Sequence, residues 1–318
     1  MKIAHISDLH LNTFYSDSNL KQIKQLFKYA VDNRSDHIVL TGDLTDNASE
    51  KDFEILRNLF RKNGLLSSER LSIVIGNHDI FGGLQTAEDI FNFPERCKKV
   101  DYDFMVNMFV EYFKETFDDC VYKSEENHFP FAKLIRDTLI TGVNSIARYS
   151  GVKNPFASNG EVDVHQFNEL FRILETYQDV KHKLVLIHHH FNKMKINKKK
   201  TASTFWQGIE KQTMKLRKKG RLFNLFNQYK IDLVLHGHLH DSVEYCRKGI
   251  RFSNGGGSIR SFQKNFVNVN FVNLNNEGIT TEIHAIRDFT LAPVIIKTEE
   301  KIKRGFESTP QLSEAVVY

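Results

Sequence analysis

Residues 37–46 read His-Ile-Val-Leu-Thr-Gly-Asp-Leu-Thr-Asp, an apolar β-strand pattern that stops at a glycine and an aspartate. The arrangement recurs in residues 2–10, where Lys-Ile-Ala-His-Ile leads to Ser-Asp-Leu-His, and in residues 71–79, where Leu-Ser-Ile-Val-Ile leads to Gly-Asn-His-Asp. Residues 19–33 and 53–62 lie between these strands and carry apolar side chains at helical spacing. This order predicts parallel strands covered by helices, with ligand-binding residues at the carboxyl ends of the strands.

The second half of the chain shows further strand and helix patterns. Residues 131–144 predict two strands, residues 164–177 predict a helix, and strands at 183–187 and 231–235 each end in histidines. Alternating apolar residues then predict antiparallel strands at 242–246, 250–253, 266–274 and 280–286.

Three segments interrupt or follow this pattern. Residues 84–125 are helical in pattern and rich in aromatic side chains, which fits either a cap over a substrate or helices that simply pack on the body. Residues 193–221 are strongly basic, which fits a lysine-rich surface or a positive rim for phosphate-bearing substrates. We therefore expect one catalytic domain over residues 1–290, with insertions at 84–125 and 193–221, and a C-terminal tail over 291–318.

Composition limits the class of protein. The 318 residues carry a net charge of +5, which suits an anionic substrate and is too weak to indicate nucleic-acid binding by itself. The three cysteines show neither a disulfide framework nor a zinc-binding spacing, which favours reduced thiols. Polar residues interrupt the N-terminus too early for a signal peptide, and no apolar run reaches the ~18 residues of a membrane span. These features favour a cytoplasmic protein.

The polar residues at the strand ends have the chemistry of metal ligands. They are Asp, Asn and His without Cys, a mixed oxygen and imidazole set that suits Mn, Fe, Zn or Ni. In an extended segment, residues two apart point to the same side, so the Asp8/His10 and His238/His240 pairs can each converge on one ion. Asp43 is the natural bridge between two ions, because Gly42 before it permits a tight turn.

Taken in order, the five blocks resemble the signature of the calcineurin-like metallophosphoesterase superfamily. They are Asp8-Leu9-His10, Gly42-Asp43, Gly76-Asn77-His78-Asp79, His188-His189-His190 and Gly237-His238-Leu239-His240. The resemblance implies a four-layer αββα sandwich with two mixed β-sheets and a binuclear metal site at one edge. It also implies a phosphoesterase in which a metal-bridging hydroxide attacks phosphorus.

The resemblance assigns a role to each residue. Asp8, His10 and His240 would bind the first metal, Asp43 would bridge, and Asn77, His238 and one histidine of the triplet would bind the second. His78 would act on the leaving group, oriented by Asp46, whose carboxylate would favour the cationic form of the imidazole. Which histidine of the triplet binds the metal stays open. Aligning Phe191 with a proline that is common in the family makes His189 the ligand, and we favour this choice. The phase of the strand also allows His188.

The sequence narrows the substrate less sharply. Asn47 follows Asp46, so the Gly-Asp-x-x-Asp-Arg-Gly signature of phosphoprotein phosphatases is absent. Residues 160–166 resemble instead the branch that contains cyclic nucleotide phosphodiesterases and glycerophosphodiesterases. We therefore expect a cyclic nucleotide or another small phosphodiester as the substrate. The alternatives are a nuclease, a nucleotide-lipid pyrophosphate hydrolase and a non-catalytic metal-binding scaffold; the sequence sets neither the metal identity nor the oligomeric state.

Overall fold

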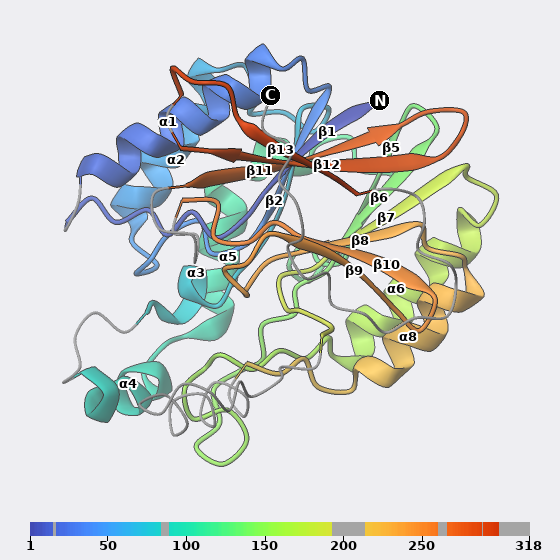
Figure 1. The fold of residues 1–318 in the computed structure, drawn as a ribbon. Coiled ribbons are helices and arrows are strands. Elements are labelled where there is room, and N and C mark those ends of the chain that lie inside the picture. Colours follow the sequence, from blue (N-terminus) through green and yellow to red (C-terminus); the bar gives the residue numbers. More distant parts are fainter. Residues whose placement is uncertain (15–16, 84–88, 193–213, 260–265, 288, 299–318) are drawn as a thin grey trace, which may run out of the picture.

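The first β-sheet grows from the alternating strands and helices at the start of the chain (Figure 1). This computed structural model describes residues 1–14, 17–83, 89–192, 214–259, 266–287 and 289–298. Three parallel strands form one half of the sheet: β1 (Lys2–Ile6), β2 (His37–Thr41) and β3 (Leu71–Val74). Helices α1 (Asp17–Asp32) and α2 (Glu50–Lys62) connect them. Antiparallel strands then extend the sheet beyond β1 as β11 (Val267–Leu274), β12 (Ile279–Ile286) and β13 (Val294–Thr298).

The second sheet has seven strands. Its parallel centre consists of β6 (Thr138–Gly142), β7 (His182–Leu186), β8 (Leu233–His236) and β10 (Ile250–Asn254). Antiparallel strands complete its two edges: β5 (Phe131–Ile135) and β4 (Tyr122–Lys123) on one side, and β9 (Val243–Arg247) on the other. Helices α6 (Val164–Thr176) and α8 (Lys219–Gln228) connect its parallel strands.

The two sheets pack face to face, and helices cover their outer sides. One buried cluster joins Leu40 of β2 with Leu186 of β7, and a second joins Leu170 of α6 and Phe223 of α8 with Val185 of β7. Figure 1 shows α1 and α2 outside the first sheet and α6 and α8 outside the second. The expected four-layer αββα sandwich with two mixed sheets is therefore confirmed.

The insertion near residues 84–125 forms α4 (Asp89–Lys98), α5 (Tyr102–Tyr112) and the short η1 (Lys114–Phe117). Phe109 of α5 packs edge-on against Phe53 of α2, with 5.8 Å between ring centroids. The segment that follows also packs on α2, where Phe113 lies 5.8 Å from Phe60. Much of this insertion thus serves packing, and a cap over the substrate stays a prediction.

One segment differs in part from the expected plan, and two others lie mostly or wholly outside the described residues. Residues 294–298, expected within the tail, form β13 at the edge of the first sheet; the sequence did not show it because a short Val-Ile-Ile run carries too little periodicity to be recognised alone. Most of the basic insertion lies outside the described residues, as do residues 299–318, so the choice between a lysine-rich surface and a positive rim stays open. In the described part of the chain, no helix combines the length and the apolar character that a membrane crossing requires.

Candidate metal centre

The loops after β1 and β2 run side by side and bring their polar residues together at one sheet edge. Asp8 N donates to Gly42 O and His10 N donates to Asp43 O, both at 3.0 Å. Asp46 N then donates to Leu11 O at 3.0 Å. The parallel pairing of β1 and β2 thus continues past the strand ends, which fixes the first two blocks of the site relative to each other.

The backbone is strained where the ligands are expected. Asp8, His10, Asp43 and His238 all adopt positive φ angles, of 53°, 44°, 51° and 71°. Residues with a Cβ adopt this left-handed region rarely, and each such residue costs about 1–3 kcal/mol. Strain of this kind is concentrated at functional sites, where surrounding contacts hold it in place.

Glycines let the loops approach one another closely. A Cβ on Gly76 would lie 2.0 Å from Asp43 N, and a Cβ on Gly42 would lie 2.6 Å from His188 Nδ1. No side chain fits at either position without moving a residue of the site. These two glycines therefore set the distance between the loops that follow β2, β3 and β7.

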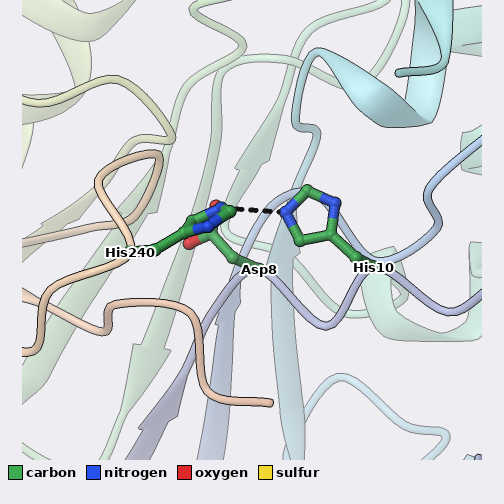
Figure 2. A group of neighbouring side chains, drawn as sticks. All are labelled: Asp8, His10 and His240. Carbon is green, nitrogen blue, oxygen red and sulfur yellow. Dashed lines mark hydrogen bonds and ion pairs between the residues drawn. The ribbon is translucent and has the colours of Figure 1, made fainter. Parts of the chain in front are cut away.

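Asp8, His10 and His240 form the first cluster, from the ends of β1 and β8 (Figure 2). The two imidazole rings meet edge to face at an interplanar angle of 68°, with their Nε2 atoms 3.0 Å apart. His240 Nε2 lies 3.7 Å from Asp8 Oδ1, and His238 N donates to both oxygens of Asp8 at 3.1 Å. Three potential ligand atoms thus converge on one point.

Asp43, Asn77, His188 and His238 form the second cluster. His188 Nε2 lies 3.1 Å from His238 Nδ1, 3.2 Å from Asn77 Oδ1 and 3.4 Å from Asp43 Oδ2. The His188 ring is fixed from behind, because its Nδ1 donates to Thr41 O at 2.8 Å. That hydrogen bond leaves Nε2 with a free lone pair directed at the other three residues.

The donor atoms of both clusters fit metal ions. Two nitrogens bound at right angles to one ion, with bonds of ~2.1 Å, lie about 3.0 Å apart, and both imidazole pairs have this spacing. Asp43 Oδ2 lies 3.8 Å from His10 Nε2 and 3.4 Å from His188 Nε2, so one oxygen faces both clusters. Burial lowers the pKa of His188, but the Asp43 carboxylate raises it to about 9, so a proton and a metal ion would compete for Nε2.

Within the histidine triplet, the structure places His188 in the cluster, whereas we favoured His189 from the sequence. Both ring nitrogens of His189 face other partners: Nδ1 lies 2.8 Å from Ser145 Oγ and Nε2 lies 3.2 Å from Ser158 O. Its ring packs beside that of His238, with 4.5 Å between centroids. The geometry therefore makes His188 the candidate ligand and His189 its buried neighbour.

His78 and Asp46 lie beside the first cluster. His78 Nδ1 is 3.4 Å from Asp46 Oδ1, and its side chain is 25% exposed. Burial lowers the His78 pKa, but the carboxylates of Asp43 and Asp46 raise it to about 9, so the imidazole is cationic at neutral pH. Burial conversely raises the Asp46 pKa, and the His10 and His78 rings outweigh it and hold that pKa well below its usual range.

Asn12 is a buried neighbour of this pair that the sequence reading did not identify. Its Nδ2 donates to Asp46 Oδ2 at 3.1 Å, and the residue is 2% exposed. Spacing alone could not have identified it, because Asp8 and His10 adopt positive φ angles and the segment is not the extended strand in which residues two apart point to the same side.

Comparison with known proteins identifies the family of the chain. The family model of calcineurin-like phosphoesterases matches residues 1–242. The chain belongs to this family. It is therefore a metal-dependent phosphoric ester hydrolase of a family with binuclear centres, and the two clusters of His and Asp are its candidate metal sites.

Individual relatives of this phosphoesterase are distant. A probable cyclic nucleotide phosphodiesterase from Ruthia magnifica subsp. Calyptogena magnifica is 21% identical over 254 residues, which cover 78% of this chain and 82% of the relative. A dimetal phosphatase from Danio rerio has a TM-score of 0.56 at 10% identity, over 93% of this chain and 98% of that chain. Purple acid phosphatase PPD1 from yellow lupin (Lupinus luteus) seeds has a TM-score of 0.55 at 12% identity, over 99% and 57% of the two chains. The solved structures share the fold.

Proposed function

We propose that this phosphoesterase hydrolyses a small phosphodiester at the centre between β1, β2, β3, β7 and β8. The observation that carries the proposal is the position of Asp43 Oδ2, which faces an imidazole of each cluster, with the cationic His78 alongside. A shared carboxylate between two ligand sets is the arrangement that two-metal hydrolysis requires.

Each residue has a distinct proposed part in binding metal. Asp43 would bridge the two sites, and the remaining ligands would be Asp8, His10 and His240 at the first site, and Asn77, His188 and His238 at the second. Bound metal ions supply positive charge that polarises the phosphoryl group and lowers the pKa of a water molecule toward neutrality. The preference for Mn, Fe, Zn or Ni follows from the mixed imidazole and carboxylate donors.

His78 is proposed to deliver the proton that the leaving oxygen needs. Its Nδ1 faces Asp46, both at Oδ1 and at the backbone carbonyl oxygen 3.2 Å away, which leaves Nε2 to donate to the substrate. The partial exposure of His78 and of His240, whose side chains are 25% and 33% exposed, gives a substrate access from solvent. A cationic imidazole there also offsets charge that develops in the transition state.

The choice of a diester substrate has two supports. The relative from Ruthia magnifica is named a probable cyclic nucleotide phosphodiesterase. The loop after Asp43 reads Leu-Thr-Asp-Asn and lacks the arginine that follows in phosphoprotein phosphatases. We therefore place a cyclic nucleotide or a similar small diester first among the substrates.

The deciding experiment compares bis-p-nitrophenyl phosphate with p-nitrophenyl phosphate, using Mn²⁺, Ni²⁺, Zn²⁺ or EDTA, for the wild type and Asp43→Asn. We expect metal-dependent cleavage of the diester, lost with EDTA and in the variant, because Asn cannot supply a bridging carboxylate. A preference for the monoester would overturn the diesterase assignment and leave the metal centre standing. A folded, metal-loaded protein without activity on either ester would point to a selective nuclease, a nucleotide-lipid pyrophosphate hydrolase or a binding scaffold.

A further inference from the structure

One carboxylate oxygen serves two histidines with different tasks. Asp46 Oδ1 lies 3.3 Å from His10 Nδ1 and 3.4 Å from His78 Nδ1. The two rings meet edge to face, with 4.6 Å between centroids and an interplanar angle of 85°. The orientation of the Asp46 carboxylate therefore affects both a candidate metal ligand and the candidate proton donor.

The second oxygen of Asp46 is held separately, because Asn12 Nδ2 donates to Oδ2 at 3.1 Å. We propose that Asn12 is a positioning residue for the hydrolysis: by holding Asp46 Oδ2, it directs Oδ1 between the two rings and so fixes the His78 imidazole toward the leaving group. This inference rests on the proposed function, and it adds a residue to which neither the family match nor the relatives assign a part.

The backbone around Asn12 makes it a rigid anchor. Leu11 N donates to Leu44 O and Asp46 N donates to Leu11 O, both at 3.0 Å, so the two loops cannot slide past each other. Asn12 is 2% exposed and Asp46 is 6% exposed. A carboxylate attached through one rotatable bond turns freely unless both of its oxygens are engaged, and here Asn12 engages the one that the histidines do not.

An amide is also the suitable chemical group at this position. It donates a hydrogen bond without carrying a charge, whereas a lysine or arginine would form an ion pair with Asp46 and compete with the two imidazoles for its oxygens. A carboxylate at position 12 would repel Asp46 instead. Among polar side chains of this size, asparagine therefore orients Asp46 and leaves its charge available to His78.

Leaving-group dependence tests this role, because proton donation matters little when the leaving group is already a stable anion. Bis-p-nitrophenyl phosphate releases such an anion, whereas diphenyl phosphate releases the more basic phenolate. We expect Asn12→Leu, which keeps the branched shape and removes the donor, to lower kcat on diphenyl phosphate by about tenfold or more, and on the nitrophenyl ester by less than about threefold. His78→Asn sets the full size of this selectivity.

Asn19 supplies the matched control. It is another buried asparagine, 5% exposed, and its Nδ2 donates to two backbone carbonyls, His10 O at 2.8 Å and Leu9 O at 3.4 Å. If the effect of Asn12 were only loss of local packing around the first cluster, Asn19→Leu would show the same pattern. We expect Asn19→Leu to slow both esters equally.

The outcomes separate the two levels of the proposal. Unequal slowing in Asn12→Leu, with metal content and thermal midpoint near those of the wild type, supports the positioning role. Equal slowing of both esters in Asn12→Leu, beside unequal slowing in His78→Asn, overturns it and leaves the proposed function intact. If Asn12→Leu does not fold, Asn12→Val, a smaller side chain that also lacks the donor, is judged by the same criterion. A wild type that cleaves neither ester overturns the proposed function, and the positioning role with it.

Discussion

Gly83 offers a sharp test of where the His78 ring must lie. A Cβ at this position would sit 2.4 Å from His78 Cε1 and 2.5 Å from His78 Nδ1, whereas ordinary contacts begin near 3.4 Å. The backbone at Gly83 is not free to yield, since its N–H donates to Asp46 O at 2.8 Å and its carbonyl accepts from Arg96 Nη2 at 2.5 Å. Gly83→Ala should therefore push the imidazole rather than the loop.

The expected size follows from the overlap. Restoring normal contact requires the His78 ring to move by about 1 Å, and a displacement of ~1 Å in a reacting group costs on the order of 100-fold in rate. His78 is not among the proposed ligands, so the metal content should stay at the wild-type value. We thus expect kcat on diphenyl phosphate to fall about 100-fold while the fold and the metal centre persist.

The assay pairs Gly83→Ala with Gly220→Ala at the start of α8, where an added Cβ meets nothing within 4 Å. Both proteins are measured for kcat, metal content and thermal midpoint. Gly220→Ala should keep its activity and gain up to about 1 kcal/mol of stability, because alanine favours the helix. If Gly83→Ala retained kcat within about threefold, the His78 ring would not occupy a confined position, and the assignment of its role would fail.

Two further predictions concern the histidine triplet and a buried lysine. Metal analysis should show that His188→Asn lowers the bound metal from two ions to about one per chain, whereas His189→Asn keeps two. Loss of an ion in His189→Asn and not in His188→Asn would make His189 the ligand. Burial lowers the pKa of Lys133 from 10.5 to about 7, so between these values the unfolded chain binds more protons and the free energy of unfolding rises with pH. Urea denaturation should show this rise as about 3–4 kcal/mol between pH 7 and pH 10 in the wild type relative to Lys133→Met, and equal slopes would contradict it.

The sequence predicts most of the architecture because the strands that matter are short, apolar and bounded by turn residues. The strands expected at 37–41 and 183–187 appear as His37–Thr41 and His182–Leu186, since their residues are buried on both faces and leave no ambiguity of pattern. By contrast, α8 begins at Lys219, within a segment that looked only basic. Its apolar face, which includes Phe223, becomes visible only when the helix is packed on β10.

The candidate site was predictable to the level of the loop, and less so to the level of the residue. Moving one position along an extended segment turns a side chain to the opposite side, so a run of three histidines presents adjacent residues to different surroundings. What separates them lies far away in the sequence: Thr41 O fixes His188, while Ser145 and Ser158 enclose His189. Such contacts depend on how the two sheets meet, which no local pattern encodes.

The strained residues at the sheet edge show that potential ligand atoms are kept there at a cost in backbone strain. Positive φ angles at Arg136 and Lys248 fall in two-residue hairpin turns, where a glycine would serve equally well. At Asp8, Asp43 and His238 a glycine would relieve about 1–3 kcal/mol of strain each, but it would also remove a potential ligand atom. Asp8 accepts a hydrogen bond from His238 N, and Asp43 Oδ1 accepts one from His78 N, but an asparagine oxygen could accept the same bonds without a buried charge. Backbone strain retained at three separate strand ends therefore supports the proposal that these three side chains bind metal.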